Sequence, residues 1–241
     1  MRGPVIWIAA IAALAGCVES SGPVPSPPPS TAADAAGVPS KTPADAARTF
    51  VQVVARMEPV IERECRQRLP GGGCDFTIAV DDRPGLPPNA YQTLDRAGNP
   101  VIAFTPALVY DARNADELAF VLGHEAAHHI EKHIPRQREN ALTGALALGA
   151  IAAMNGAGTE AVEAARNLGA GLGARAYSKD YELEADSLGT YLAWVAGYDP
   201  AVGAQFFARI PDPGDAFLGT HPPNGARLSR VQSTLVALRG Y

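Results

Sequence analysis

The chain has 241 residues, of which 47% are hydrophobic and 19% are charged, and this composition excludes a wholly disordered protein. The formal net charge is −5, from 20 Lys and Arg against 25 Asp and Glu. A net acidic chain without a basic block argues against nucleic acid as the main partner, so we expect no nucleic-acid binding.

The N-terminal segment, residues 1–16, has the pattern of an export signal. Arg2 precedes an apolar run over residues 5–14, which is too short to span a bilayer and suits the core of a signal peptide. The run Leu-Ala-Gly-Cys that ends at Cys17 resembles the lipobox of bacterial lipoproteins, which implies cleavage before Cys17 and a lipid anchor on it. Val18, in place of Asp, favours the outer membrane in the sorting pattern of such lipoproteins. An ordinary secretory signal is the alternative.

The next segment, residues 17–43, is rich in Pro, Ser and Ala and predicts an extended tether. The remaining residues, 44–241, have the length of a single domain. Helical periodicity dominates this domain and the strand signals are few, so the sequence predicts an α+β, mostly helical fold with a small sheet.

Hydrophobic spacing places the elements of this domain in the following order. Asn114 is the expected N-cap of one helix, Glu117 is its capping-box acid, and Pro135 is expected to end it. Helices are predicted over 44–69, 115–134, 140–154, 159–177, 179–196 and 225–238, and strands over 75–80 and 101–105.

The stretch from Ala141 to Met154 is apolar throughout, which is too short for a bilayer span. We expect it to form a buried helix or a lid near the active-site cleft. A loop that touches the membrane is the alternative.

Two cysteines besides Cys17 flank a glycine-rich turn, and we expect Cys65 and Cys74 to form a disulfide, because an oxidising periplasm permits one. The alternative is two free thiols. A zinc site made of these two thiolates is not expected, since no histidine nearby would complete its coordination shell.

The most informative residues are His124, Glu125 and His128, in the spacing His-Glu-x-x-His. Positions i and i+4 of a helix are about 40° apart, so both imidazoles point the same way and can hold one zinc ion. Glu125 is rotated by about 100° from His124, beside the metal, where a carboxylate can take a proton from zinc-bound water. The alternative is an amphipathic helix with solvated polar residues.

A catalytic zinc needs three protein ligands, and the helix over 179–196 offers a third. Glu182 and Asp186 are four residues apart and share a helix face, so Glu182 can bind the ion while Asp186 orients a ligand histidine by a hydrogen bond. Glu184 lies about 200° from Glu182 and cannot share that task. A solvated acidic helix start is the alternative.

The other histidines do not complete this site. His129 and His133 lie about 100° and 140° around the helix from His128, so we expect them to pack or to support the ligands rather than bind the ion. His221 stands apart, before the last helix.

These motifs together resemble the metallopeptidase family of HtpX and the type I CAAX prenyl proteases, family forty-eight, and its small bacterial lipoprotein members most of all. The resemblance covers about residues 44–240. The residues that carry it, besides the His-Glu-x-x-His motif, are His133, Glu182 with Asp186, Thr220-His221-Pro222, Arg227-Leu228 and the Pro88-Asn89-Ala90-Tyr91 segment.

The resemblance implies a zincin-like domain that holds one zinc ion with His124, His128 and Glu182 and uses Glu125 as the base. It also implies that substrate lies along an edge strand, for which residues 101–105 are the candidate. The expected activity is zinc-dependent endopeptidase action on misfolded or unassembled envelope proteins. The expected location is the periplasmic side of the outer membrane, through the lipid anchor at Cys17.

His221 has three open roles. It can stabilise the developing oxyanion, with Arg227 as its neighbour, or it can occupy the open zinc position until substrate displaces it. The third reading is a structural loop histidine.

Two other functions remain as alternatives. The first is a non-enzymatic envelope-protein assembly factor or chaperone with a structural zinc, against which Glu125 argues, because a closed structural site needs no base. The second is another hydrolase with the same His-Glu-x-x-His motif.

Overall fold

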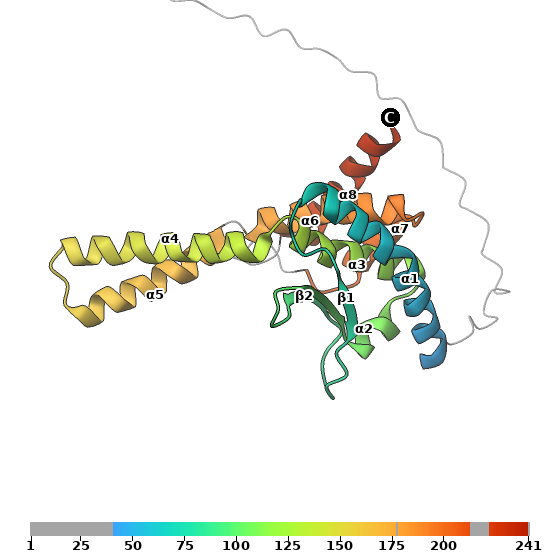
Figure 1. Ribbon diagram of the computed structural model, residues 1–241, viewed down its shortest axis with the longest axis horizontal. Helices are drawn as coiled ribbons and strands as arrows, with labels where there is room; N and C mark the ends of the chain where they lie inside the picture. The colour runs from blue at the N-terminus through green and yellow to red at the C-terminus, as the bar shows by residue number, and fades with distance from the viewer. Residues whose placement is uncertain (1–40, 177, 213–221, 241) are drawn as a thin grey trace, which may run out of the picture. The chain divides into compact units, whose positions relative to one another are not determined.

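The computed structural model describes residues 41–176, 178–212 and 222–240. The expected signal peptide, Cys17 and nearly all of the expected tether lie outside these residues, as does His221. The described residues are mostly helical with a small mixed sheet, which confirms the predicted α+β class (Figure 1). The elements are α1 (Pro43–Arg68), β1 (Thr77–Val80), β2 (Ala90–Leu94), β3 (Pro100–Phe104), α2 (Pro106–Asp111), α3 (Ala115–Ile130), α4 (His133–Met154), α5 (Thr159–Ala176), α6 (Ser178–Val195), α7 (Pro200–Gly203), the 3₁₀ helix η1 (Ala204–Ala208) and α8 (Asn224–Arg239).

The sheet has the order β1-β3-β2, with β3 in the middle. Ile102 of β3 pairs with Ile78 in parallel on one side and with Gln92 in antiparallel on the other. The prediction that residues 101–105 form an edge strand is therefore wrong. The strand beside the site is β2, which the sequence analysis did not predict. Its residues are mostly half-buried on both faces, so its sequence lacks the alternation of apolar and polar residues that predicts a strand.

Helix α1 follows the predicted range to within a residue at each end. It begins with a capping box in which the side chains of Thr42 and Asp45 each accept a hydrogen bond from the other residue's backbone amide. Phe50, Val53 and Met57 lie on its buried face, and this face packs against α3. Pro59 lies inside the helix.

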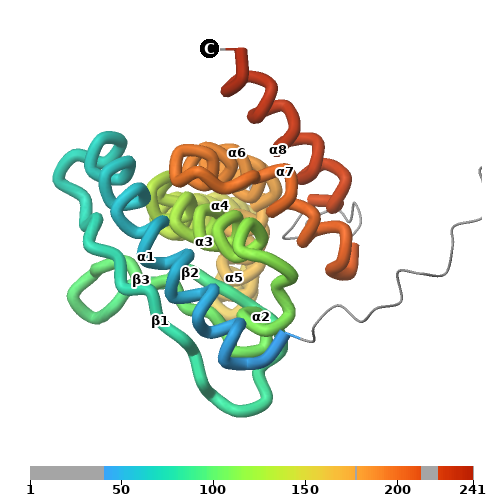
Figure 2. Tube along the Cα trace, turned by 90° about the vertical axis from the view of Figure 1, so that its right-hand side faces the viewer, coloured from blue at the N-terminus to red at the C-terminus, as the bar shows by residue number. Residues whose placement is uncertain are grey.

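Helix α3 lies at the centre of the described fold and is buried along most of its length. Figure 2 shows it between the sheet and α6. The side chain of Asn114 accepts a hydrogen bond from the amide of Glu117 and caps its first turn, as the sequence predicts. A helix packed on both sides in this way holds its side chains in fixed positions, which matters for the residues it carries in its last two turns.

The junction between α3 and α4 differs from the prediction that one helix runs over 115–134 and stops at Pro135. α3 ends at Ile130, and Lys132 adopts a left-handed conformation with φ of 58°. α4 then begins at His133, with Pro135 in its first turn, where a missing backbone N–H costs no hydrogen bond. The break turns the chain so that His133 faces back toward the end of α3.

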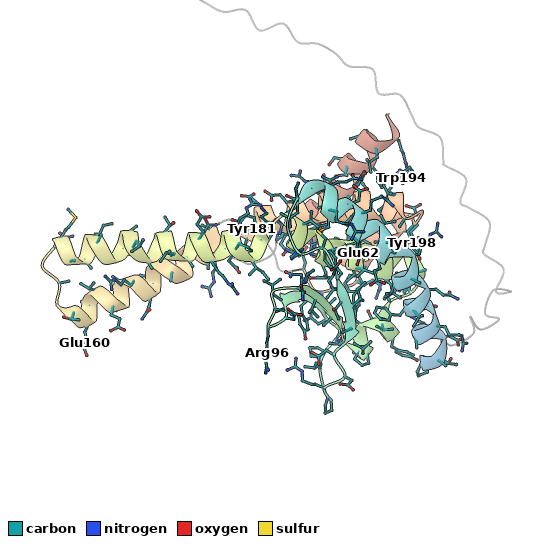
Figure 3. The ribbon with its side chains drawn as sticks, in the orientation of Figure 1. Glu62, Arg96, Glu160, Tyr181, Trp194 and Tyr198 are labelled. Carbon is teal, nitrogen blue, oxygen red and sulfur yellow. A yellow bond between two sulfur atoms is a disulfide. The ribbon has the colours of Figure 1, made fainter. Side chains whose placement is uncertain are left out.

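Helices α4 and α5 form an antiparallel hairpin that projects from the rest of the described domain (Figure 1). The two backbones approach closely at glycines, since a Cβ on Gly144 would lie 2.1 Å from the carbonyl oxygen of Gly169, and one on Gly173 would lie 2.1 Å from that of Asn140. Figure 3 shows Tyr181 near the base of the hairpin and Glu160 at its free end.

This hairpin contradicts the expectation that residues 141–154 form a buried helix. The small residues of α4 pack on α5, and the larger apolar side chains are left on the outside, so that Leu142 and Met154 are 61% and 87% exposed. No helix in the described part of the chain has the length and apolar character to cross a membrane.

Cys65 and Cys74 form a disulfide that joins the last turn of α1 to the segment before β1, with 5.7 Å between the Cα atoms. The neighbouring residue Gly73 contacts α3, because its carbonyl oxygen lies 2.6 Å from Nε2 of His129. The cross-link therefore fixes a loop that touches the helix carrying the His-Glu-x-x-His motif.

Candidate metal centre

The last two turns of α3 carry His124, Glu125 and His128. The two histidines are one helical turn apart, and their Nε2 atoms lie 3.0 Å from each other. His124 is buried, and His128 and Glu125 are partly exposed at the wall of a cavity. The helix thus presents two imidazole nitrogens to the same point.

Helix α6 brings Glu182 to that point. Its Oε2 lies 3.5 Å from Nε2 of His124, and its Oε1 lies 3.5 Å from Nε2 of His128. Three such donor atoms, all within 4.8 Å of one another, form a group that suits a metal ion. Tetrahedral coordination with bonds of about 2.0–2.1 Å separates ligand atoms by about 3.3–3.4 Å, so two imidazoles and one carboxylate at these distances fit a catalytic zinc ion.

The crossing of α3 and α6 holds the two ligand helices together. A Cβ on Gly189 would lie 2.8 Å from the backbone nitrogen of His124, and one on Gly123 would lie 2.9 Å from the carbonyl oxygen of Gly189. The absence of both Cβ atoms allows the backbones to touch, and this brings Glu182 within reach of the histidines.

Replacing Gly189 by Ala is therefore expected to weaken both folding and metal binding. The added methyl group would push α6 from α3 and lower the free energy of unfolding by about 1–3 kcal/mol. Zinc affinity, measured by competition with a chromophoric chelator, should fall with it. Gly171→Ala on the exposed side of α5, where a Cβ meets no atom within 4 Å, is the control and should leave zinc affinity unchanged. Equal zinc affinity in both variants would contradict this role of the crossing.

Asp186 supports His124 from behind. Its Oδ1 lies 2.9 Å from Nδ1 of His124, as the spacing of Glu182 and Asp186 predicts. The carboxylate is fully buried and also accepts two hydrogen bonds from Arg227 of α8, at 2.8 and 2.7 Å. This arrangement fixes the ring so that its Nε2 points to the metal position.

Arg227 is part of the support of the site, and its expected place beside His221 stays a prediction, because His221 lies outside the described residues. Arg227 pairs with Asp186, lies 3.5 Å from Glu182, and stacks over the ring of Phe207 at 3.7 Å. No sequence signal could have joined Arg227 to Asp186, because they lie 41 residues apart on helices whose packing is not encoded in local spacing.

The electrostatics of the site favour a cation. Burial and Arg227 act against charge on His124, but the hydrogen bonds with Asp186 and Glu182 outweigh them and raise the pKa of His124 to about 9. Burial, together with the charge on His124, lowers the pKa of His128 to about 3. The carboxylates that favour a proton on His124 favour a metal ion in the same place, and a neutral His128 is the form that binds zinc.

Glu125 has the character of a base. Burial raises the pKa of its carboxyl group, and this effect is opposed by His124 and by the backbone amide of Gln92. A raised pKa makes the carboxylate a better proton acceptor than an exposed glutamate would be.

A second set of contacts, which sequence reasoning only partly foresaw, supports His128. Its Nδ1 lies 2.8 Å from Nδ1 of His133, whose Nε2 lies 3.1 Å from Glu184. Arg136 donates hydrogen bonds to both oxygens of Glu184 at 2.6 and 3.3 Å, and Tyr181 stacks on His133 with ring centroids 4.7 Å apart. His133 thus has the supporting role expected. Glu184 is not one of the clustered ligands, but it supports the site through its contacts with His133 and Arg136 of α4.

The metal position opens into a cavity of about 640 Å³, bounded by residues of the described chain. Its lining comes from β2 and the segment before it, from α2, α3, α4, α6 and α8, and from η1 with the residues after it. The apolar lining includes Leu108, Val121, Phe206, Phe207 and Ile210. The cavity is large enough for several side chains of an extended peptide.

Comparison with known proteins gives two findings. The model for Peptidase family M48 matches residues 48–235. The chain is also 36% identical over 121 residues to the "Putative beta-barrel assembly-enhancing protease" of Vibrio cholerae serotype O1, in a match that covers 46% of this chain and 24% of that protein. The chain therefore aligns with about a quarter of that relative's length.

Proposed function

The chain belongs to peptidase family M48, and on this premise we propose that it is a zinc-dependent endopeptidase of the bacterial cell envelope that acts on misfolded or unassembled envelope proteins. The observation that carries the proposal is the cluster of His124, His128 and Glu182 at the wall of a cavity, with Glu125 beside it. Three ligands leave a position open, as a catalytic site requires.

The chemistry follows from these positions. A zinc ion held by His124, His128 and Glu182 would polarise the scissile carbonyl and would lower the pKa of the attacking water toward neutrality. Glu125 accepts the proton of that water at its carboxylate and passes it to the nitrogen of the leaving amine. Asp186 keeps His124 oriented through its Nδ1, and His133 contacts Nδ1 of His128 on the other side and fixes that ring.

Substrate binding is proposed along β2 rather than along residues 101–105. β2 is an edge strand because only β3 pairs with it in the described sheet, and its residues Ala90, Tyr91 and Gln92 line the cavity. An extended peptide that adds to this edge would run past Glu125 and the metal position with its backbone fixed. Main-chain pairing is insensitive to sequence, which suits an enzyme that cuts unfolded chains.

The envelope location rests on three supports. The lipobox-like run at Cys17 implies a lipid anchor, which we propose holds the enzyme on the periplasmic side of the outer membrane. The Cys65–Cys74 disulfide suits an oxidising compartment. The name of the Vibrio cholerae relative describes a protease that enhances β-barrel assembly.

Metal removal tests this function directly. The purified full chain is expected to contain about one zinc ion per molecule and to cleave casein, an unfolded substrate, but not a stably folded protein. A chelator should abolish cleavage, and added zinc should restore it, as measured by the appearance of new amino termini. Cleavage that persists in metal-free protein would contradict the proposal.

A further inference from the structure

The outer part of the α4–α5 hairpin is unusually apolar for an exposed element. Residues 141–154 of α4 include no charged residue. Four large side chains of this helix are more than half exposed, namely Leu142, Leu146, Ile151 and Met154. Leu168 and Leu172 of α5 are also exposed, at 60% and 37%. So many large exposed apolar side chains on one hairpin mark a binding site rather than scattered surface residues.

Apolar side chains lie on both flanks of the outer part of α4, with the uncharged, exposed Thr143 between them. Helical spacing places Leu142 and Leu146 on one flank and Ile151 and Met154 on the other. The remaining side, which includes Gly144, packs against α5. A helix that is apolar all around is typical of an element enclosed by its surroundings.

The charged residues of the outer hairpin lie on α5. Glu160 and Glu163 are exposed there, and the side chain of Arg166 lies over Gly149. The hairpin is therefore amphipathic as a unit. Its apolar side chains lie on α4 and on the flank of α5 that carries Leu168 and Leu172, and its polar edge is the opposite flank of α5, which carries Glu163. Charge returns at the base, where Arg138, Glu139 and Arg175 are exposed.

We propose that the hairpin docks on a lipid bilayer, with the outer part of α4 among the acyl chains and the polar edge of α5 toward water. The fourteen residues 141–154 are about 21 Å long, shorter than the roughly 30 Å of a bilayer core, so α4 lies in the interface and does not span it. The charged base marks the depth at which the hairpin leaves the lipid.

The surface suits lipid better than a protein partner. Protein interfaces have an apolar centre with a polar rim, whereas residues 141–154 of α4 are apolar on both flanks and include no charged residue. The acyl chains of a bilayer contact both flanks of a helix that lies in the interface, so such a helix needs no polar rim around its apolar surface. The predicted lipid anchor would hold the same molecule at the same membrane, which raises the local concentration of the hairpin there.

Docking would also orient the metal centre, because α4 begins at the residues that support it. His133 contacts the ligand His128, and Arg136 pairs with Glu184 of α6. A bilayer that holds the outer part of α4 would thus hold the cavity at a set angle and height above the membrane. The proposal concerns membrane contact alone and does not depend on peptidase activity.

Fluorescence quenching on the full chain tests the proposal. A single environment-sensitive label is placed at Ile151→Cys on α4 or, as the matched control, at Glu163→Cys on the polar edge of α5. The protein is bound to vesicles of phosphatidylethanolamine and phosphatidylglycerol that carry nitroxide-labelled acyl chains. We expect quenching at 151 to be several-fold stronger than at 163. Equal or absent quenching at both positions would overturn the proposal.

Charge substitution gives the second arm. Leu142→Lys with Met154→Lys, in the chain labelled at 151, should reduce quenching to the level of the label at 163. Asn167→Lys, which adds charge on the polar edge of α5, should leave quenching unchanged. All these positions are exposed, so circular dichroism should show unchanged helix content. Persistent quenching in the doubly charged variant would overturn membrane docking. So would a change in the emission of the label at 151 that needs high protein concentration and no vesicles, and this second result would favour a second copy of the chain as the partner.

Discussion

Replacing Glu125 by Gln is expected to abolish peptide hydrolysis and to leave zinc binding intact. The change keeps the shape of the side chain but removes its ability to accept the proton of the attacking water. Loss of a general base typically costs about 10²–10⁴-fold in rate. Glu125 is not among the three clustered donors, so the zinc content of the purified variant should equal that of the parent.

Turnover of an unfolded substrate and metal analysis on the same sample check this result together. Glu160→Gln, at the free end of the hairpin, is the matched control and should retain full activity. Substrate turnover by the Glu125→Gln variant would contradict the proposed mechanism, in which Glu125 is the base. If parent and variant promoted assembly of envelope proteins in cells equally well, the alternative of a non-enzymatic assembly factor with a structural zinc would be favoured.

Replacing Asp186 by Ala is expected to damage both metal binding and stability. His124 would lose the hydrogen bond that orients it, and loss of such a supporting contact typically lowers metal affinity about 10–100-fold. Arg227 would be left buried without its main partner, which typically costs about 3–5 kcal/mol of unfolding free energy. Denaturation of the metal-free protein measures the second effect without interference from zinc.

A double variant separates these two effects. Asp186→Leu with Arg227→Met removes both buried charges, so most of the lost stability should return. Zinc affinity should stay low, because His124 still lacks its support. If the double variant recovers zinc affinity together with stability, Asp186 acts only through the fold, and its proposed role in orienting the ligand is wrong.

The sequence predicts the parts of the site that depend on the geometry of a single helix. His124, Glu125 and His128 follow from spacing on α3, and Glu182 with Asp186 follows from spacing on α6. That these two groups of residues meet depends on the crossing at Gly123 and Gly189, and no local pattern reveals which glycines will face each other. The family resemblance, rather than spacing, supplied that step.

The remaining supports of the site depend on tertiary structure and were missed or misplaced. Glu184 reaches the site only because α3 breaks at Lys132 and α4 turns back, whereas the sequence predicts one continuous helix that ends at Pro135. Likewise, β2 has little alternation in burial and gave no strand signal. The apolar run in α4 is predicted to be buried because its side chains prefer to leave water. The sequence does not show whether the protein's own core or another surface covers them.

The contact between Gly73 and His129 gives the cross-link at Cys65 and Cys74 a consequence for timing. A newly made chain in a reducing cytoplasm would lack the disulfide, and its Gly73 loop would no longer be held against the metal-binding helix α3. We expect such a chain to remain latent, since the loop that steadies α3 would be loose. If the chain is exported as we propose, proteolysis would begin only in an oxidising space, and the proteins of the compartment where the chain is made would be spared.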